Sequence, residues 1–405
     1  MIIFTLNGEK HQYEGDVNQS LLSYLRLDQH LTAAKDGCSG QAACGVCTVE
    51  VNGKAVLSCV TKMQRLEGAE IFTAEGFPKY VLDTIAKAFV NKGAVQCGFC
   101  SPGFIARTKV LLQNNPKPSI EEIRKAIKPH LCRCTGYKKI EEAIEYASEH
   151  ICENKSIEIN QTTGKIGEAE PKYQAYETAI GKRDFVDDIF FDDMLFAALK
   201  FSDHPKAKVI SIDVSKAVKY PGVHRIVLAE DIPGEKKVGL ILQDWSVMIA
   251  PGKTTHYIGD VLAGVIADSD KTAREAMELI EVEYEILDPV TDVFQAIEGA
   301  AVHRERPNHF DTCQFTIGDA EKAINDSAFV SSGKYETQRI EHAFLEKEAA
   351  IARPDGKGGI ELFSQSQGVY EDRRQVALIL GLEEEQVRVI LVPNGGGFGG
   401  KEDMT

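Results

Sequence analysis

Two groups of cysteines are the residues of this 405-residue sequence best suited to chemistry. Eight of its ten cysteines lie between residues 38 and 134. The first set comprises Cys38, Cys44, Cys47 and Cys59, and the second set comprises Cys97, Cys100, Cys132 and Cys134. Four thiolates bind one [2Fe–2S] cluster, with two sulfurs on each iron. The two sets therefore predict two such clusters.

Structural zinc is the alternative, because four thiolates also bind one zinc ion. The Cys97-x-x-Cys100 and Cys132-x-Cys134 spacings suit zinc as well as iron. In the first set, however, three cysteines crowd one glycine-rich loop and the fourth lies on a following strand, which favours a cluster. Glycines beside the ligands also allow backbone N–H groups to approach the inorganic sulfides.

The remaining composition narrows the class of protein. Cys152 and Cys313 belong to neither set and are predicted to be inert core thiols. Thiolate ligands must stay reduced, so we expect a reducing compartment, the cytoplasm. The net charge of −15 argues against nucleic acid and anionic membranes as partners. No apolar run approaches the roughly 18 residues of a membrane span, and the N-terminus lacks the basic start of a signal peptide.

The first cysteine set lies in a segment with hairpin signals. Asn7-Gly8 and Asn52-Gly53 are turn dipeptides that each join two short strands. A helix is predicted to begin after Ser20, a suitable N-cap residue. Two hairpins and a helix around a cysteine loop predict a plant-type β-grasp ferredoxin domain over residues 1–76.

The hydrophobic period changes from two to 3.6 after residue 76, which predicts a four-helix domain over residues 77–152. Ser119 opens one of these helices as part of a capping box. The second cysteine set then falls at the joints of the helices. Two cysteines precede the second helix, and two precede the last.

The rest of the chain alternates helices and strands. Residues 153–170 are polar and aperiodic and are predicted to be a linker. Residues 171–300 and 301–405 have mixed α/β patterns, with one strand predicted at 330–335 and another at 387–392. The fold class is therefore multidomain α+β.

A glycine loop follows the last strand. Gly395-Gly396-Gly397-Phe398-Gly399-Gly400 offers backbone groups to an anionic or planar ligand. Its spacing matches neither the Walker A motif nor the dinucleotide fingerprint. A flexible linker is the alternative, which a phenylalanine at the centre of the loop disfavours.

This order of domains and motifs resembles the molybdenum hydroxylases, the family of the xanthine dehydrogenases and aldehyde oxidoreductases. The resemblance covers essentially the whole chain. It rests on segments 45–48, 96–103, 132–137, 257–260, 341–346 and 395–402. It implies an α/β hammerhead-like domain over residues 171–300 and the start of a molybdopterin-binding domain over residues 301–405.

The resemblance also implies roles for individual residues in binding the cofactor. Gln96 and Cys134 would lie near the pterin of a molybdenum–molybdopterin cofactor. Gln367 would hydrogen-bond an oxygen ligand of the metal. Gly397 and Phe398 would direct backbone N–H groups to the metal.

Glu402 decides the expected substrate. It resembles the carboxylate that recognises the heterocycle in purine-hydroxylating members, where an apolar pocket would raise its pKa. A solvent-facing residue after a loop is the alternative. The resemblance and Glu402 together predict a molybdenum-dependent oxidoreductase that hydroxylates xanthine, hypoxanthine or related N-heterocycles and passes electrons through two [2Fe–2S] clusters. An aldehyde oxidoreductase, or an electron-transfer module without a complete molybdenum site, are the alternatives.

Three features depart from the family pattern. Five residues separate Cys38 from Cys44, whereas the plant-type spacing has four, and residues 39–43 are expected to absorb the extra residue as a bulge. No FAD-sized domain follows the linker, so a flavin subunit, a ferredoxin or another acceptor is expected to take the electrons. The chain ends at Thr405, so an incomplete molybdenum site is expected, with the remaining molybdopterin domain in cis or in a separate chain. The 405 residues alone are expected to be inactive.

Overall fold

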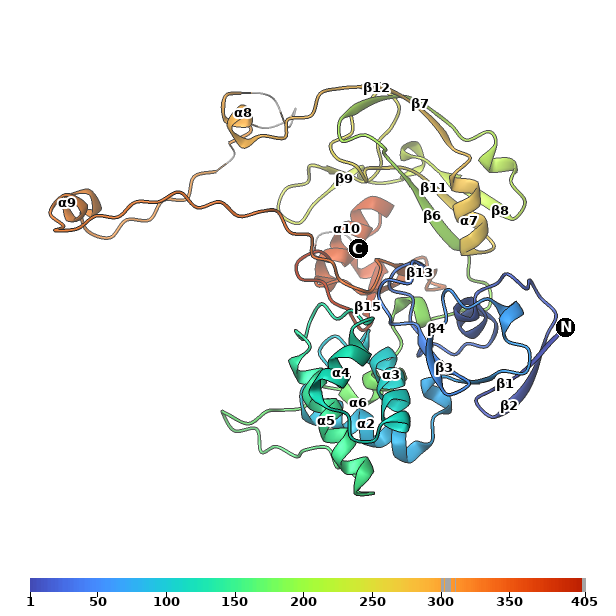
Figure 1. Cartoon of the computed structure of the whole chain (residues 1–405). Coiled ribbons are helices and arrows are strands. Elements are labelled where there is room, and N and C mark those ends of the chain that lie inside the picture. The colour runs from blue at the N-terminus through green and yellow to red at the C-terminus, as the bar shows by residue number, and fades with distance from the viewer. Residues whose placement is uncertain (300–301, 303–306, 310, 403–405) are drawn as a thin grey trace. The chain divides into compact units, whose positions relative to one another are not determined.

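The computed structural model describes residues 1–299, 302, 307–309 and 311–402 of the chain. The chain forms two compact units (Figure 1). One unit comprises Met1–Asp192 and His342–Thr405, and the other comprises Asp193–Glu341. All eight cysteines of the two sets and the glycine loop belong to the first unit.

The first unit begins with a five-stranded sheet in the order β2-β1-β5-β3-β4. Its strands are β1 (Ile2–Leu6), β2 (Glu9–Tyr13), β3 (Thr48–Val51), β4 (Lys54–Leu57) and β5 (Glu70–Phe72). Strands β1 and β5 run parallel, and the other pairs are antiparallel. Asn7 and Asn52 adopt φ values of 51° and 50°, as tight hairpin turns require. Ser20 caps helix α1 (Leu21–Ser23) by accepting the backbone N–H of Ser23, so the predicted β-grasp elements are confirmed.

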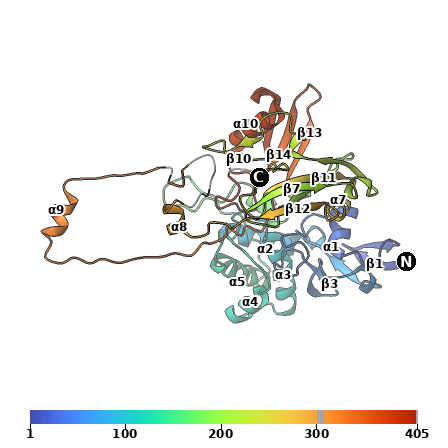
Figure 2. The same ribbon diagram turned by 90° about the horizontal axis from the view of Figure 1, so that it is seen from above.

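Four helices follow in sequence and gather together in both views (Figures 1 and 2). They are α2 (Lys79–Asn91), α3 (Ser101–Asn114), α4 (Ile120–Ile127) and α5 (Lys138–Cys152). Their apolar faces are buried against one another because residues such as Ile85, Phe89 and Phe104 recur at helical spacing. The predicted capping box at Ser119 is formed, with both of its hydrogen bonds present. Cys100 is the N-cap residue of α3, and the other cysteine pair precedes α5.

The segment after the linker packs on these helices. Ala175 and Ala179 of α6 (Ala175–Ala179), together with Phe185, are buried in the helical core. Asp188 forms buried ion pairs with Arg26 and Lys35 of the ferredoxin domain. The second compact unit therefore begins at Asp193, whereas the hammerhead-like domain was predicted to begin at residue 171.

Among its described residues, the second unit contains three small antiparallel sheets, β6-β11-β8, β12-β7 and β10-β9. Its strands and helices are β6 (Phe196–Phe201), β7 (Ala207–Asp213), β8 (Val223–Val227), β9 (Lys237–Val238), β10 (Trp245–Ser246), β11 (Val261–Ala267), α7 (Asp270–Met277), β12 (Glu281–Ile286), α8 (Val293–Ile297) and α9 (Ala320–Asn325). Strand β11, helix α7 and strand β12 follow one another along the chain. The two strands nevertheless pair with different partners, so they do not form a parallel crossover.

Residues 330–335 form no strand, so that prediction was wrong. They follow α9 in an extended segment (Figure 1). Their side chains, such as that of Tyr335, are exposed, and a β-type pattern forms no ladder without a neighbouring strand. The predicted domain boundary at residues 300–301 lies outside the described residues.

The end of the chain forms a three-stranded sheet in the order β13-β14-β15. Strands β14 (Ile360–Ser364) and β15 (Val387–Leu391) are parallel and are connected by α10 (Val369–Leu380), while β13 (Ala350–Pro354) pairs antiparallel with β14. The glycine loop leaves the C-terminal end of β15, which is where parallel strands commonly present a ligand site.

Two free cysteines correct the sequence analysis. Cys152 and Cys313 are exposed, not buried in a core. Cys152 is the last residue of α5, where its thiol donates to the Pro116 carbonyl at 3.2 Å. Among the helices of the described residues, none combines the length and apolar character needed to cross a membrane.

Candidate functional site

The first cysteine set forms two thiol pairs. The side chains of Cys38 and Cys44 hydrogen-bond to each other, and those of Cys47 and Cys59 do the same. Backbone N–H groups of the loop also donate to the Cys38 sulfur, including those of Ala43 and Cys44. Two pairs, each able to hold one iron, are the arrangement that a [2Fe–2S] cluster uses.

The loop absorbs its extra residue through unusual backbone conformations. Ser39 and Ala42 have φ values of 49° and 58°, in the left-handed region that non-glycine residues seldom adopt. Gly40, between them, has φ 76°. The turn directs the Ala42 N–H toward the Cys59 sulfur. Cys38 thus lies beside Cys44 although five residues separate them.

The second set is gathered from two helix joints. The Cys97 thiol hydrogen-bonds to Cys134 and the Cys100 thiol to Cys132. The Thr135 hydroxyl donates to Cys132 Sγ at 3.1 Å. A positive φ of 63° at Gly136 helps the chain turn sharply between these ligands and α5.

Four thiols in each set fit a [2Fe–2S] cluster, which takes two sulfurs on each iron. In the second set the thiols form one connected group, because Cys132 hydrogen-bonds to both Cys100 and Cys134, and Cys134 also hydrogen-bonds to Cys97.

Hydrogen bonds between the thiols make some of them acidic. The hydrogen bond from Cys47 lowers the pKa of Cys59 to about 7. Hydrogen bonds from Cys100 and Cys134 lower the pKa of Cys132 to about 2. The same hydrogen bonds raise the pKa of the donors Cys47, Cys100 and Cys134, so each bond shares one proton between two thiols.

The two cysteine loops touch. The Leu131 N–H, next to Cys132, donates to the Cys44 carbonyl at 2.8 Å. Nearby, the Thr48 hydroxyl and His130 Nε2 are 3.1 Å apart. Burial, followed by the charge of Arg107, lowers the pKa of His130 to about 3, so His130 is neutral at ordinary pH. A single hydrogen bond therefore joins Cys44 of the first set to Leu131, the neighbour of Cys132 in the second set.

The glycine loop contacts the Gln367 side chain. Gln367 Oε1 accepts the Gly399 N–H at 3.0 Å and the Lys401 N–H at 3.4 Å. A Cβ atom on Gly397 would lie 2.2 Å from Gln367 Oε1, so a side chain there would have to displace the Gln367 carboxamide. Because both neighbours are donors, the carboxamide oxygen must face the loop and its NH₂ group faces away.

The exposed face of this loop suits an anionic cofactor. Gln367 and Phe398 are exposed, and Phe398 has φ 57°. Gln367 can offer its NH₂ group, and the loop can offer backbone groups. These residues fit the molybdopterin role that the family resemblance implies for Gln367, Gly397 and Phe398.

A buried ion pair behind the loop was not among the residues predicted for the site. Lys401 Nζ donates to Glu346 Oε2 at 2.8 Å and also to the Gln365 carboxamide. Glu346 Oε2 further accepts the Gly395 N–H at 2.6 Å. Burial raises the pKa of Glu346, and Lys401 opposes that shift. Both residues lie in motifs that carried the resemblance, but only the fold reveals that they meet.

Segment 342–347 also contacts both cysteine loops. Arg133, between Cys132 and Cys134, donates through Nε to the His342 carbonyl at 2.8 Å. Lys347 pairs with Asp36, just before Cys38, at 2.9 Å. The cysteine sets and the glycine loop are therefore held together as one site.

Two predicted residues lie apart from these contacts. Glu402 is exposed, so the described residues do not form the apolar surroundings expected for it. The Gln96 side chain is exposed as well, while its carbonyl accepts a hydrogen bond from Lys172. Cys134 is half-buried within the second set.

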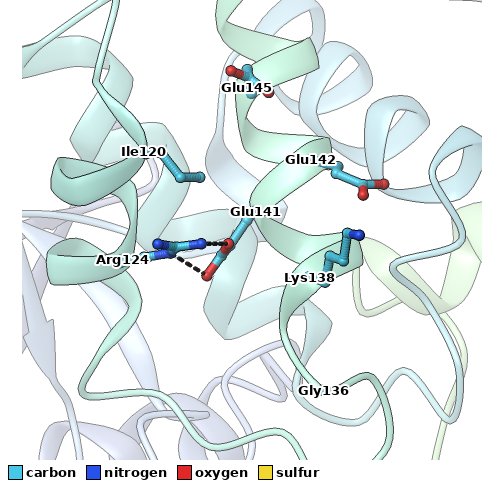
Figure 3. A pocket seen from close by; sticks show the side chains of 7 residues that line it. All are labelled: Ile120, Arg124, Gly136, Lys138, Glu141, Glu142 and Glu145. Carbon is cyan, nitrogen blue, oxygen red and sulfur yellow. Dashed lines mark hydrogen bonds and ion pairs between the residues drawn. The ribbon is translucent and has the colours of Figure 1, made fainter.

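A surface pocket of about 510 Å³ lies elsewhere, between α4 and α5 (Figure 3). Arg124 forms two hydrogen bonds to Glu141 there, at 3.0 and 3.1 Å. Glu142 and Glu145 also line the pocket. No cysteine and no glycine-loop residue lines it, so we assign it no part in the chemistry.

Four family models match successive parts of the chain. Residues 4–71 match the 2Fe-2S iron-sulfur cluster binding domain, and residues 73–145 match the [2Fe-2S] binding domain. Residues 180–288 match the a/b hammerhead domain of aldehyde oxidase and xanthine dehydrogenase. Residues 302–405 match the molybdopterin cofactor-binding domain. Two cluster domains and a molybdopterin-binding region are thus confirmed.

Known proteins resemble the chain over its whole length and in its iron–sulfur part. The aldehyde oxidoreductase of Megalodesulfovibrio gigas is 34% identical over 100% of this chain and 47% of its own length. The small FeS subunit of nicotinate dehydrogenase from Eubacterium barkeri is 43% identical over 38% of this chain and 97% of its own length. The solved structure of the aldehyde oxidoreductase from Desulfovibrio gigas matches with a TM-score of 0.89 and 30% identity, over 98% of this chain and 46% of that chain.

The chain thus spans about half the length of the full-length relative that it matches. Domain order, ligand sets and relatives agree with one another. The chain therefore belongs to the molybdenum hydroxylase family, which includes the xanthine dehydrogenases and the aldehyde oxidoreductases.

Proposed function

We propose that the chain is the iron–sulfur and partial molybdopterin portion of an enzyme that hydroxylates an electron-poor carbon oxidatively. The observation that carries this proposal is the joining of both cysteine sets to the glycine-loop region through Arg133 and Lys347. When bound, the molybdenum–molybdopterin group supplies the two-electron oxidation, and the clusters supply one-electron transfer.

The chain's own residues position the cofactor. Gln367 is oriented by two loop amides so that its NH₂ group can donate to the cofactor. The Glu346–Lys401 pair holds the loop from behind. Gln96 and Cys134 remain our candidates for pterin contacts, and the hydrogen bond between Leu131 and Cys44 joins the two cluster loops.

For the substrate we propose a purine, such as xanthine or hypoxanthine, or a related N-heterocycle. Glu402 supports this proposal, because a carboxylate can exchange hydrogen bonds with ring nitrogens and their protons. A relative named for nicotinate, also an N-heterocycle, supports it as well. Glu402 is exposed in the part of the chain that the structure describes. It would therefore bind a heterocycle only when further residues surround it.

An aldehyde is the second candidate substrate. It is favoured by the relative named aldehyde oxidoreductase, which aligns with the entire chain at 34% identity. The loop geometry suits either substrate, because Gln367 and the loop amides address the cofactor and not the substrate.

The chain covers 47% of that relative, so we propose that turnover needs the unmatched portion, in cis or in a partner chain. A general base is expected there, and a positioned base contributes typically 10²–10⁴-fold. We propose that a flavin subunit or a ferredoxin accepts the electrons, in a reducing compartment such as the cytoplasm.

This proposal is tested by expressing residues 1–405 alone and together with a portion that corresponds to the unmatched part of the relative. Together they should bind molybdenum and oxidise xanthine, hypoxanthine or nicotinate, whereas residues 1–405 alone should not. Glu402→Val should then lower purine turnover more than aldehyde turnover. An equal effect of this substitution on purine and aldehyde turnover would favour the aldehyde candidate. Purine turnover by residues 1–405 alone would contradict the proposal that the unmatched portion is needed.

A further inference from the structure

Residues 171–185 form a strap across the loop that carries Cys97 and Cys100. Ala175 and Ala179 of the strap are buried in the same core cluster as Phe99 and Cys100. The Phe185 ring packs edge-on against Phe99, with ring centroids 5.1 Å apart. The strap is therefore held by packing and not by surface contacts alone.

The strap approaches the cysteine loop closely. Gly98 has φ +87°, and a Cβ atom there would lie 2.1 Å from Thr178 Cγ2. Tyr176 anchors the same segment by donating to Asp83 Oδ1 at 2.6 Å. These contacts hold the strap, and the Lys172 carbonyl at its start accepts the Ala175 N–H at 3.0 Å.

The ammonium group of Lys172 lies beside the backbone of the loop that carries Cys97. Lys172 Nζ donates to the Gln96 carbonyl and, at 3.2 Å, to the carbonyl of the ligand Cys97. Both acceptors are uncharged. Lys172 forms no ion pair with any carboxylate of the described chain, so no carboxylate neutralises its charge.

A fixed positive charge beside a cluster changes the cluster's reduction equilibrium. Reduction adds one negative charge to a [2Fe–2S] cluster, and the net charge around a cluster helps set its potential. A cation within a few ångströms of a ligand stabilises the more negative state. Lys172 is exposed to solvent, which limits this effect but does not remove it.

We propose that Lys172 is an electrostatic positioning residue that raises the reduction potential of the cluster bound by the second cysteine set. A higher reduction potential makes electron transfer from the cofactor to that cluster more favourable. The inference deepens the proposed function, yet it depends only on assembly of the second cluster and not on molybdenum or the substrate.

The test compares three variants of the full chain by redox titration of both cluster signals in electron paramagnetic resonance. Lys172→Gln keeps a hydrogen-bond donor without charge, Lys172→Met removes both, and Lys172→Arg keeps the charge. The Gln and Met variants should shift the reduction equilibrium of the second cluster about tenfold toward the oxidised form, which is about 59 mV for one electron. The Arg variant should restore the wild-type value.

Two controls separate charge from structure. The first cluster of the same molecules should keep its potential, and Lys165→Met, which removes an exposed linker charge, should shift neither cluster. Unchanged potentials in both neutral variants, or a shift in the Met variant alone, would overturn the charge proposal. Loss of the second signal in both neutral variants would show a structural role and would overturn it too. Failure of molybdenum binding leaves this measurement intact.

Discussion

Lys401 and Glu346 form a buried ion pair, with Nζ 2.8 Å from Oε2, that joins the glycine loop to a segment 55 residues earlier. Their side chains are 0% and 3% exposed. The same carboxylate accepts the Gly395 N–H, so both ends of the glycine loop depend on one charged group. The backbone groups of the loop are thus positioned from behind.

Lys401→Met should destabilise this part of the molecule. Removal of one partner from a buried ion pair costs about 3–5 kcal/mol, because the remaining charge is left uncompensated. Denaturant unfolding of the variant should show a loss of that order. The double variant Lys401→Met/Glu346→Gln should recover part of it, whereas equal stability of wild type and Lys401→Met would contradict a stabilising role for the pair.

The same pair predicts a pH dependence. Burial raises the folded-state pKa of Glu346 above the ordinary 4.5. The contribution of Glu346 is therefore fully present below that value and is lost as pH rises through the folded pKa. Lys401→Met removes the charge that opposes the raised pKa of Glu346, so more stability is lost at high pH. The variant should therefore be destabilised more at about pH 8 than at about pH 5. A constant difference between variant and wild type across this range would count against it.

The thiol pairs predict the metal content. Purified protein should contain four irons and four labile sulfides per chain, without stoichiometric zinc, and should show two signals by electron paramagnetic resonance. Cys38→Ser should remove one signal and leave the other, and Cys132→Ser should do the reverse. Cys152→Ser, at an exposed cysteine outside both sets, is the control and should leave both. A colourless protein with bound zinc would refute the cluster assignment.

The left-handed backbone at Ala42 predicts that retention of the first cluster depends on the side chain at this position. Ala42 has φ 58°, which glycine adopts freely and a β-branched residue strongly resists. Ala42→Gly should retain the first cluster, and Ala42→Val should release it at a lower temperature. Loss of the first signal on heating measures this, with the second signal as the internal control. Equal retention by both variants would show that the turn is not strained.

Close packing at Gly397 predicts an effect on the molybdenum site. The added methyl of Gly397→Ala would lie 2.2 Å from Gln367 Oε1 and would displace it. A displacement of about 1 Å in a positioning group can cost 10²-fold in rate. Molybdenum occupancy and turnover of the completed enzyme should both fall. Gly368→Ala is the matched control, since its nearest atom lies 3.5 Å away, and an equal effect there would indicate general loop damage.

Much of the iron–sulfur half was predictable because its signals are local. Asn7-Gly8, the Ser119 capping box and the spacing of Cys97 and Cys100 each act within a few residues. Their physical basis is turn geometry, capping hydrogen bonds and ligand count, which tertiary packing did not override here.

Other features depend on contacts between distant segments, and there the sequence alone was insufficient. The strand predicted at 330–335 failed because a strand exists only with a partner. Cys152 was predicted to be buried, yet burial depends on which surfaces other segments cover. The segment after residue 171 was assigned to the next domain, although it packs on the helical core.

The amino-acid sequence by itself determined the candidate metal ligands, because cysteine type, number and spacing set the possible ligands. Tertiary structure alone decided how the charged residues surround them. Lys172 reaches Cys97, Arg133 reaches His342, and Lys401 reaches Glu346 from loops with no shared period. Such pairings arise only when packing brings distant loops together, and burial then makes each hydrogen bond or ion pair necessary.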